Sequence, residues 1–173
     1  IADGINIPFT VGGGISTLAD AARLLDAGAD KISINSAAVR QPELIDQIAG
    51  RYGSQFVVVA IDARQDESGT WHITTHGGTR STSIELFGWA REVQERGAGE
   101  ILLTSIQLFA ALTQSLRIPV IASGGAGSVD HIVEVLTQGH ADAALAASIF
   151  HYGEATIRQV KETLAAHHVP VRL

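Results

Sequence analysis

Asp62 is the residue whose type and position best suit acid–base chemistry. It directly follows the apolar run 56–61, so its carboxyl group is predicted to lie at the carboxyl end of a buried strand. A carboxyl group held there beside a substrate can accept and donate the protons that a reaction moves. An aspartate that caps a helix or forms a turn would occupy the same position. The sequence leaves both roles open.

Two glycine-rich segments are suited to bind anions. Residues 12–14 (Gly-Gly-Gly) and 124–127 (Gly-Gly-Ala-Gly) each follow an apolar run and precede an amphipathic one. Glycine lets the backbone approach an anion closely, and the helix that follows contributes its positive end. Asn35-Ser36 and Ala147-Ser148 end the neighbouring apolar runs and add a hydroxyl group to each site. We therefore predict two phosphate sites and a ligand with a phosphate at each end, although such glycines can also simply form tight turns.

The two glycine segments belong to a repeat that positions them. Residues 7–16 resemble residues 118–127, and residues 28–36 resemble residues 97–105 and 140–148, so two consecutive units recur about 111 positions later. Each unit has the order strand, loop, helix, and a duplicated half of this kind is typical of a closed parallel barrel. The loops after the strands build the active site of such a barrel. The repeat therefore places both glycine segments and the candidate acid at one end of the barrel.

Short apolar runs alternate with amphipathic stretches along the chain. The runs are almost continuously apolar, as in parallel strands that are covered on both faces. The strands are predicted at about 7–11, 31–35, 56–61, 101–104, 118–122 and 143–147. The helices are predicted at about 17–27, 42–51, 82–96, 107–116, 128–138 and 154–166. We expect an α/β fold, the (β/α)8 TIM barrel, with about six βα units in a single domain, 1–173, and two N-terminal units missing.

The composition excludes several classes of function. The chain of 173 residues has a net charge of −6, and its 12 lysines and arginines are scattered, which disfavours nucleic-acid binding. Phosphate remains possible, because backbone N–H groups can hold it without basic side chains. The absence of cysteine excludes disulfides and thiolate metal sites, and no apolar run approaches the roughly 20 residues of a membrane span. We expect a cytoplasmic protein without a signal peptide, metal or cofactor.

Seven motifs, in order along the chain, resemble the cyclase subunit of imidazole glycerol phosphate synthase. They are VGGGI, GADKISINSAAV, VVVAIDAR, THGGTRST, RGAGEILLTS, IASGGAG and AALAASIFHYGE. The resemblance implies a lyase of histidine biosynthesis, which forms a heterodimer with a glutaminase subunit. Ammonia from that partner would convert a bisphosphorylated ribulosyl aminoimidazole carboxamide intermediate to imidazole glycerol phosphate and aminoimidazole carboxamide ribotide. The alternatives are the phosphoribosyl-formimino isomerase of the same pathway and a non-catalytic barrel fragment or assembly module.

The same resemblance implies roles for particular residues at the mouth of the barrel. Of the family's two catalytic aspartates, one matches Asp62 and the other belongs to a first strand that this sequence lacks. Thr104 matches a polar residue that lines the same mouth. The phosphate-binding positions match Gly14, Asn35 and Ser36 on one side, and Gly125, Ala126, Ala147 and Ser148 on the other.

The opposite end of the barrel carries charges at the strand starts. Lys31 and Glu100 occupy the same place in two repeats, which by itself predicts a structural ion pair at the barrel floor. The resemblance implies instead that they belong to a charged gate that admits ammonia. It also places Asp30 on the face that docks the glutaminase subunit.

Two segments depart from a simple barrel. After residues 103–105 the family carries an Asp- and Gly-rich loop, whereas here residue 105 runs directly into residues 106–109. We expect this loss to weaken the second phosphate site and, together with the missing units, to leave the chain inactive by itself. Residues 65–79 are predicted to form a hairpin, which either flaps over the active site or is a surface excursion with Trp71 packed on the barrel rim.

Overall fold

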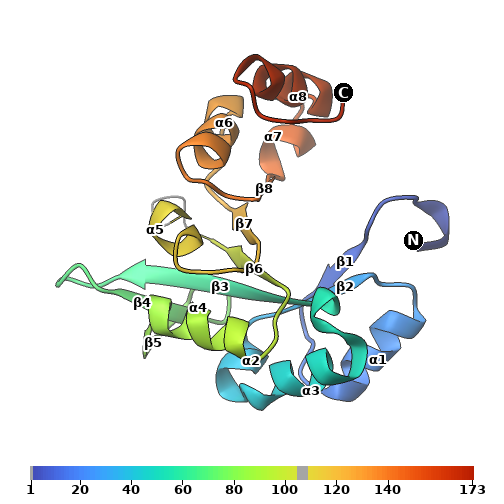
Figure 1. Ribbon diagram of the computed structural model, residues 1–173, viewed down its shortest axis with the longest axis vertical. Coiled ribbons are helices and arrows are strands. Elements are labelled where there is room, and N and C mark those ends of the chain that lie inside the picture. Colours follow the sequence, from blue (N-terminus) through green and yellow to red (C-terminus); the bar gives the residue numbers. More distant parts are fainter. Residues whose placement is uncertain (1, 105–108) are drawn as a thin grey trace. The chain divides into compact units, whose positions relative to one another are not determined.

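The computed structural model describes residues 2–104 and 109–173 (Figure 1). The chain divides into two compact units, each with its own parallel strands and helices. Unit 1 comprises residues 1–102 and 116–118, and unit 2 comprises residues 103–115 and 119–173. The expectation of a single domain for residues 1–173 stays a prediction.

Unit 1 is built on a parallel sheet. β1 (Thr10–Gly12), β2 (Lys31–Ile34) and β3 (Val57–Gln65) pair in that order, and β6 (Glu100–Leu103) is the next strand beside β3. Residues 57–59 of β3 are at most 2% exposed, as predicted for a strand covered on both faces. The helices are α1 (Leu18–Asp26), α2 (Ser36–Arg40), α3 (Glu43–Tyr52) and α4 (Leu86–Glu95), with the short 3-10 helices η1 (Ala2–Gly4) and η2 (Ser54–Phe56).

An antiparallel extension grows from β3. β3 continues to Gln65 and pairs with β4 (Trp71–Thr75), which confirms the hairpin expected within residues 65–79. β4 then pairs with β5 (Arg80–Glu85), so the prediction of helix from residue 82 was wrong. The exposure of successive β5 side chains alternates, and pairing with β4 outweighs the helical pattern there. The helix begins only at Leu86, where the Glu85 carboxylate accepts from two backbone N–H groups.

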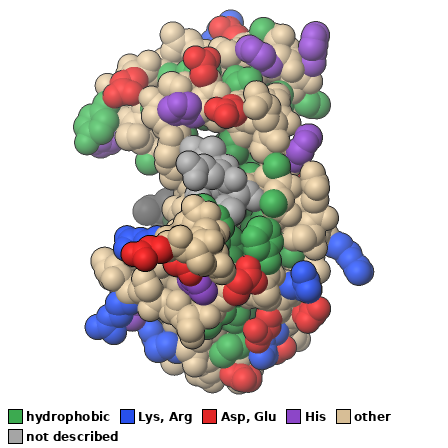
Figure 2. Space-filling model, turned by 90° about the vertical axis from the view of Figure 1, so that its left-hand side faces the viewer, with side chains coloured by type: hydrophobic (Ala, Val, Ile, Leu, Met, Phe, Trp, Pro, Cys, Tyr) green, Lys and Arg blue, Asp and Glu red, His purple; other side chains and the backbone are tan. Residues whose placement is uncertain are grey.

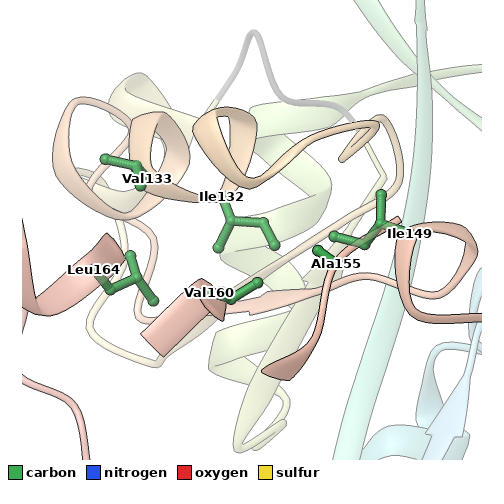
Figure 3. Packing of buried hydrophobic residues seen from close by; sticks show 6 residues of the cluster. All are labelled: Ile132, Val133, Ile149, Ala155, Val160 and Leu164. Atoms are coloured by element: carbon green, nitrogen blue, oxygen red, sulfur yellow. The ribbon is translucent and has the colours of Figure 1, made fainter. Parts of the chain in front are cut away.

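Unit 2 repeats the strand–helix pattern on a smaller scale. β7 (Val120–Ser123) pairs in parallel with β8 (Ala143–Leu145). Its helices are α5 (Phe109–Thr113), α6 (Val129–Thr137), α7 (Ser148–His151) and α8 (Ile157–Ala166). Figure 3 shows one apolar cluster, to which α6 contributes Ile132 and Val133, α7 Ile149, α8 Val160 and Leu164, and the segment between α7 and α8 Ala155. The predicted helix 107–116 is shorter than expected, and its first two residues lie outside the described part of the chain.

β1 and β8 are the exposed strands of their units. β1 pairs with β2 along one side and β8 with β7, and the middle residue of each is only half-buried. Leu145 of β8 is 47% exposed. The expectation that every strand is covered on both faces therefore fails for these two, because each has a parallel neighbour on one side among the described residues.

The repeat is visible in how two strands begin. The Asp30 carboxylate accepts from the backbone N–H of Phe9 at 2.8 Å, and the Asp30 N–H donates to the Phe9 carbonyl at 2.9 Å. Asp142 makes the same reciprocal pair with Val120, at 2.9 and 3.1 Å. The two aspartates occupy matching places in the sequence repeat, so each links its strand to the preceding one through the same pair of hydrogen bonds.

The surface carries interspersed charges. On the face drawn in Figure 2, lysine and arginine side chains lie among aspartates and glutamates and do not gather into one patch. Within residues 2–104 and 109–173, none of the helices has the length and apolar character that crossing a bilayer requires.

Candidate active site

Gly13 and Gly14 open the first candidate phosphate site. Their φ angles are +94° and +73°, in the left-handed region that favours glycine. A pocket of about 480 Å³ lies against them and is also lined by Asn35 and Ser36, at the junction of β2 and α2. The structure thus brings the glycine loop and the Asn35-Ser36 pair to one cavity.

Ser36 presents its hydroxyl group to this pocket as the first residue of α2. Its Oγ accepts from the backbone N–H of His76 at 2.9 Å. Because that contact uses the oxygen as an acceptor, the hydroxyl hydrogen is available to donate to an anion. The first turn of α2 adds backbone N–H groups without partners inside the helix.

The sequence analysis missed two basic side chains at this pocket. Arg40 and His76 both line it, so a phosphate there would meet potential cations and not only backbone N–H groups. Arg40 lies four residues after Ser36 on α2, a spacing that places both on one face of a helix. That signal was lost because α2, five residues long, was not predicted. His76 lies between β4 and β5 with φ +56°, and its Nδ1 is 3.1 Å from Thr75 Oγ1.

Asp62 lies in β3, beyond the end of the parallel ladder. The parallel pairing of β2 with β3 ends at Val59, and Asp62 stands opposite Thr74 of β4. Its position within a continuous strand rules out the turn or helix-cap role that the sequence left open. The carboxyl group is half-buried, and its Oδ2 accepts from Asn35 Nδ2 at 2.9 Å. Asp62 therefore lies next to a residue that lines the first candidate phosphate site.

Unit 2 contains a second glycine loop with the same backbone. Gly124 and Gly125 have φ angles of +83° and +76°, close to those of their repeat counterparts in unit 1. Ala147 and Ser148 form the start of α7 as Asn35 and Ser36 form the start of α2. The agreement supports two equivalent loops, one in each unit.

Thr104 and Ala126 flank the second loop. A Cβ atom placed on Gly124 would lie 3.2 Å from Thr104 Cγ2, so Thr104 packs closely against the loop. Ala126 packs against the apolar cluster of unit 2. The loop loss expected after residue 105 falls within residues 105–108, which lie outside the described residues.

Each loop is followed by a helix with a side-chain cap. Thr17 caps α1, and Asp20 accepts from the Thr17 backbone N–H at 2.9 Å, which completes a capping box. Ser128 caps α6 in the matching place, and the ring Nδ1 of His131 accepts from the Gly127 N–H at 3.2 Å. The helix starts that fix the two loops are therefore built alike.

Lys31 and Glu100 begin β2 and β6, and their side chains form an ion pair. The side chains are 28% and 20% exposed, so both charges are partly withdrawn from water. The structural ion pair that the sequence predicted is therefore present. A role in admitting ammonia stays a prediction.

Asp30 was expected on a docking face, and in the structure its side chain forms a hydrogen bond within unit 1. Its carboxylate is engaged by the Phe9 N–H, and Asp142 makes the equivalent contact in unit 2. A residue that recurs in this way has a structural reason to be there. Its part in binding a glutaminase subunit stays a prediction.

Comparison with known proteins identifies the family of the chain. Residues 1–156 match the family model described as histidine biosynthesis protein. The chain is 54% identical to imidazole glycerol phosphate synthase subunit HisF of Acidobacterium capsulatum, over 96% of the chain and 70% of that protein. It is 52% identical to the subunit of the same name from Phocaeicola vulgatus, over the whole chain and 73% of that protein.

The second alignment spans 184 residues, whereas this chain has 173, so that relative has residues at positions where this chain has none. The family match agrees with the predicted α/β fold class, the TIM barrel. The chain belongs to the histidine biosynthesis protein family, among the HisF subunits of imidazole glycerol phosphate synthase.

Proposed function

We propose that this chain carries the ring-closing centre of imidazole glycerol phosphate synthase. A bisphosphorylated ribulosyl aminoimidazole carboxamide would be the substrate, and imidazole glycerol phosphate and aminoimidazole carboxamide ribotide the products. The observation that carries the proposal is the adjacency of Asn35 and Ser36. Asn35 contacts the Asp62 carboxylate, and Ser36 lines the glycine pocket, so an acid–base group stands beside a phosphate site.

The first phosphate of the substrate would bind at Gly14 and Ser36. Backbone N–H groups at the start of α2 and the Ser36 hydroxyl would donate to its oxygens, and Arg40 would balance its charge. The other phosphate would bind in unit 2, at Gly125, Ala126, Ala147 and Ser148. Thr104 would line the approach to that second site.

Asp62 would move the protons of the reaction. Ammonia adds to the substrate's ketone carbon, and the ketone oxygen must gain protons before it can leave as water. Ring closure then joins the added nitrogen to the formimino carbon, and the bond between that carbon and the aminoimidazole amine breaks. The amine gains a proton as it leaves in aminoimidazole carboxamide ribotide, and the new ring loses protons from nitrogen and carbon. A half-buried carboxyl group held by Asn35 can do both in turn.

The relatives are named as subunits, which implies a complex with a partner subunit. We infer that this partner is a glutaminase that supplies ammonia. The ion pair of Lys31 and Glu100 lies at the strand starts, and Asp62 lies in β3 beyond the end of its parallel pairing with β2. Ammonia that enters at the strand starts would therefore pass the ion pair before it reaches the acid–base group, with Asp30 near the entrance.

The isomerase of the same pathway is the weaker alternative, since both relatives described above carry the HisF name. An isomerase consumes no nitrogen. Incubation of the intact enzyme with ammonium salt and the bisphosphate substrate distinguishes the two, because only ring closure makes product formation depend on ammonium.

The acid–base role is tested by Asp62→Asn in the intact enzyme, with ammonium salt as the nitrogen source. Turnover should fall on the order of 100-fold or more, with KM nearly unchanged, because the amide keeps the shape of the carboxyl group but cannot exchange its proton. Thermal unfolding should match the wild type. Turnover at the wild-type rate would show that Asp62 is not the acid–base group.

A further inference from the structure

We propose that Asn35 is a positioning residue for Asp62, and that its side chain serves the carboxylate and not the phosphate. This inference rests on the proposed function, because it concerns the acid–base group of that reaction. The residues at the start of α2 would then have two separate roles. The backbone of the helix start and Ser36 would hold the phosphate, while the amide of Asn35 would hold the group that moves protons.

The contact that carries this proposal is a hydrogen bond between two side chains. Asn35 Nδ2 donates to Asp62 Oδ2 at 2.9 Å, and the two residues are 27 positions apart. Asn35 directly follows β2, and Asp62 lies in β3, the neighbouring strand of unit 1. Both side chains are half-buried. A hydrogen bond to a charged acceptor is shorter and stronger than one between neutral groups, so it can select one orientation of the carboxyl group.

The helix start does not need the Asn35 side chain. Asparagine at an N-cap ordinarily accepts from backbone N–H groups of the first turn, but the Asn35 side chain makes no such bond. Its backbone angles are φ −132° and ψ −93°. The amide therefore contributes nothing to capping α2 and is turned to Asp62 instead.

The repeat supplies a control within the same chain. Ala147 holds the matching N-cap place before Ser148, with φ −122° and ψ −58°. An alanine thus suffices for the same kind of helix start, beside a glycine loop with the same φ angles. If the phosphate site needed an amide side chain at this position, the second copy, which has Ala147 there, could not supply one.

The test is a set of variants of the intact enzyme, assayed with ammonium salt at saturating and limiting substrate. Asn35→Ala, which reproduces the residue of the second copy, should lower kcat by about 10- to 100-fold, because misplacing a reacting group costs rate. KM should change by less than about 2-fold, since substrate binding would be untouched. Ser36→Ala is the matched control and should raise KM with little effect on kcat.

The isosteric variant separates hydrogen bonding from packing. Asn35→Asp keeps the shape of the side chain but removes the N–H donor and sets a second carboxylate against the first. At saturating substrate it should therefore lose more kcat than Asn35→Ala. A side chain that only filled space would give the opposite order, and that order would overturn the proposal.

A double-mutant cycle with Asp62→Asn distinguishes failure of this inference from failure of the proposed function. In the Asp62→Asn background, Asn35→Ala should leave the residual kcat nearly unchanged, because there is no acid–base group left to position. If the kcat effects of the two substitutions were fully additive, or if Asn35→Ala changed KM and not kcat, the positioning role of Asn35 would be overturned. The acid–base role of Asp62 would still stand. Wild-type turnover in Asp62→Asn would overturn both.

Discussion

A carboxylate placed at Ser36 tests whether a phosphate binds there. Ser36→Asp puts a negative charge at the first residue of α2, in the wall of the glycine pocket. The fold should tolerate it, because an acidic residue suits a helix start and can accept the His76 N–H as the serine does. We expect the free energy of unfolding to change by less than about 1 kcal/mol.

The effect on the substrate should be much larger. Two unit charges about 4 Å apart repel by about 4 kcal/mol at the effective dielectric constant near a protein surface. The pocket is open to solvent and Arg40 lines it, so we take about half of that value, roughly 2 kcal/mol. Since about 1.4 kcal/mol corresponds to a factor of ten, KM for the bisphosphate substrate should rise about 30-fold.

Steady-state kinetics of the intact enzyme, with thermal unfolding beside it, measures both quantities. Ser36→Asn is the matched control, because it has the size of the aspartate without its charge. The aspartate should raise KM well above the asparagine, and added salt should narrow the difference. Equal KM values for the two variants would mean that no anion binds at Ser36.

The ion pair, the first glycine loop and the β3–β4 hairpin each give a further prediction. Glu100→Gln should lower the free energy of unfolding, measured with denaturant, by about 1–2 kcal/mol, because it leaves the Lys31 ammonium partly buried without its partner. Replacing both residues by apolar ones should recover most of this loss, and no recovery would contradict the prediction. Gly14→Ala should cost about 1 kcal/mol through its φ of +73° alone, since no atom lies within 4 Å of the added methyl group, and calorimetry should show weaker binding of inorganic phosphate. The Ser68 hydroxyl donates to Asp66 and, with other hydrogen bonds, lowers the pKa of Asp66 to about 2, below its value in the unfolded chain. The stabilisation of the hairpin tip is therefore complete above about pH 4 and is lost as the pH falls through about 2. Because the Ser68 backbone N–H donates to Asp66, its NMR signal should move over that pH range in the wild type and not in Asp66→Asn.

The sequence was most informative where burial and repetition coincide. β2, α1 and α3 lie close to their predicted bounds, because apolar periodicity and glycine boundaries mark them. β3 begins near its predicted start but continues to Gln65, past the predicted end at residue 61. The repeat also placed Asn35-Ser36 beside the first glycine loop, since equivalent units turn equivalent loops to one side. The hydrogen bond between the Asn35 and Asp62 side chains could not be predicted from the sequence, because it depends on the rotamers of both side chains.

The errors share one physical cause, which is that short elements lack a periodic signal. α2 and α7 span five and four residues, too few for a helical pattern to show. β5 was assigned to a helix because its stabilising partner, β4, belongs to an antiparallel extension and not to the barrel pattern. Missing α2 and β5 hid Arg40 and His76, which stand on α2 and at the β4–β5 turn.

The central claim is that the two copies of the glycine loop bind the two phosphates of one substrate. Calorimetric titration of the intact enzyme with a bisphosphate ligand, and with the same ligand lacking one phosphate, tests it most directly. The account predicts tighter binding of the bisphosphate, weakened by either Ser36→Asp or Ser148→Asp, and monophosphate binding that only one of the two variants weakens. Equal affinity of the wild type for the two ligands would contradict it.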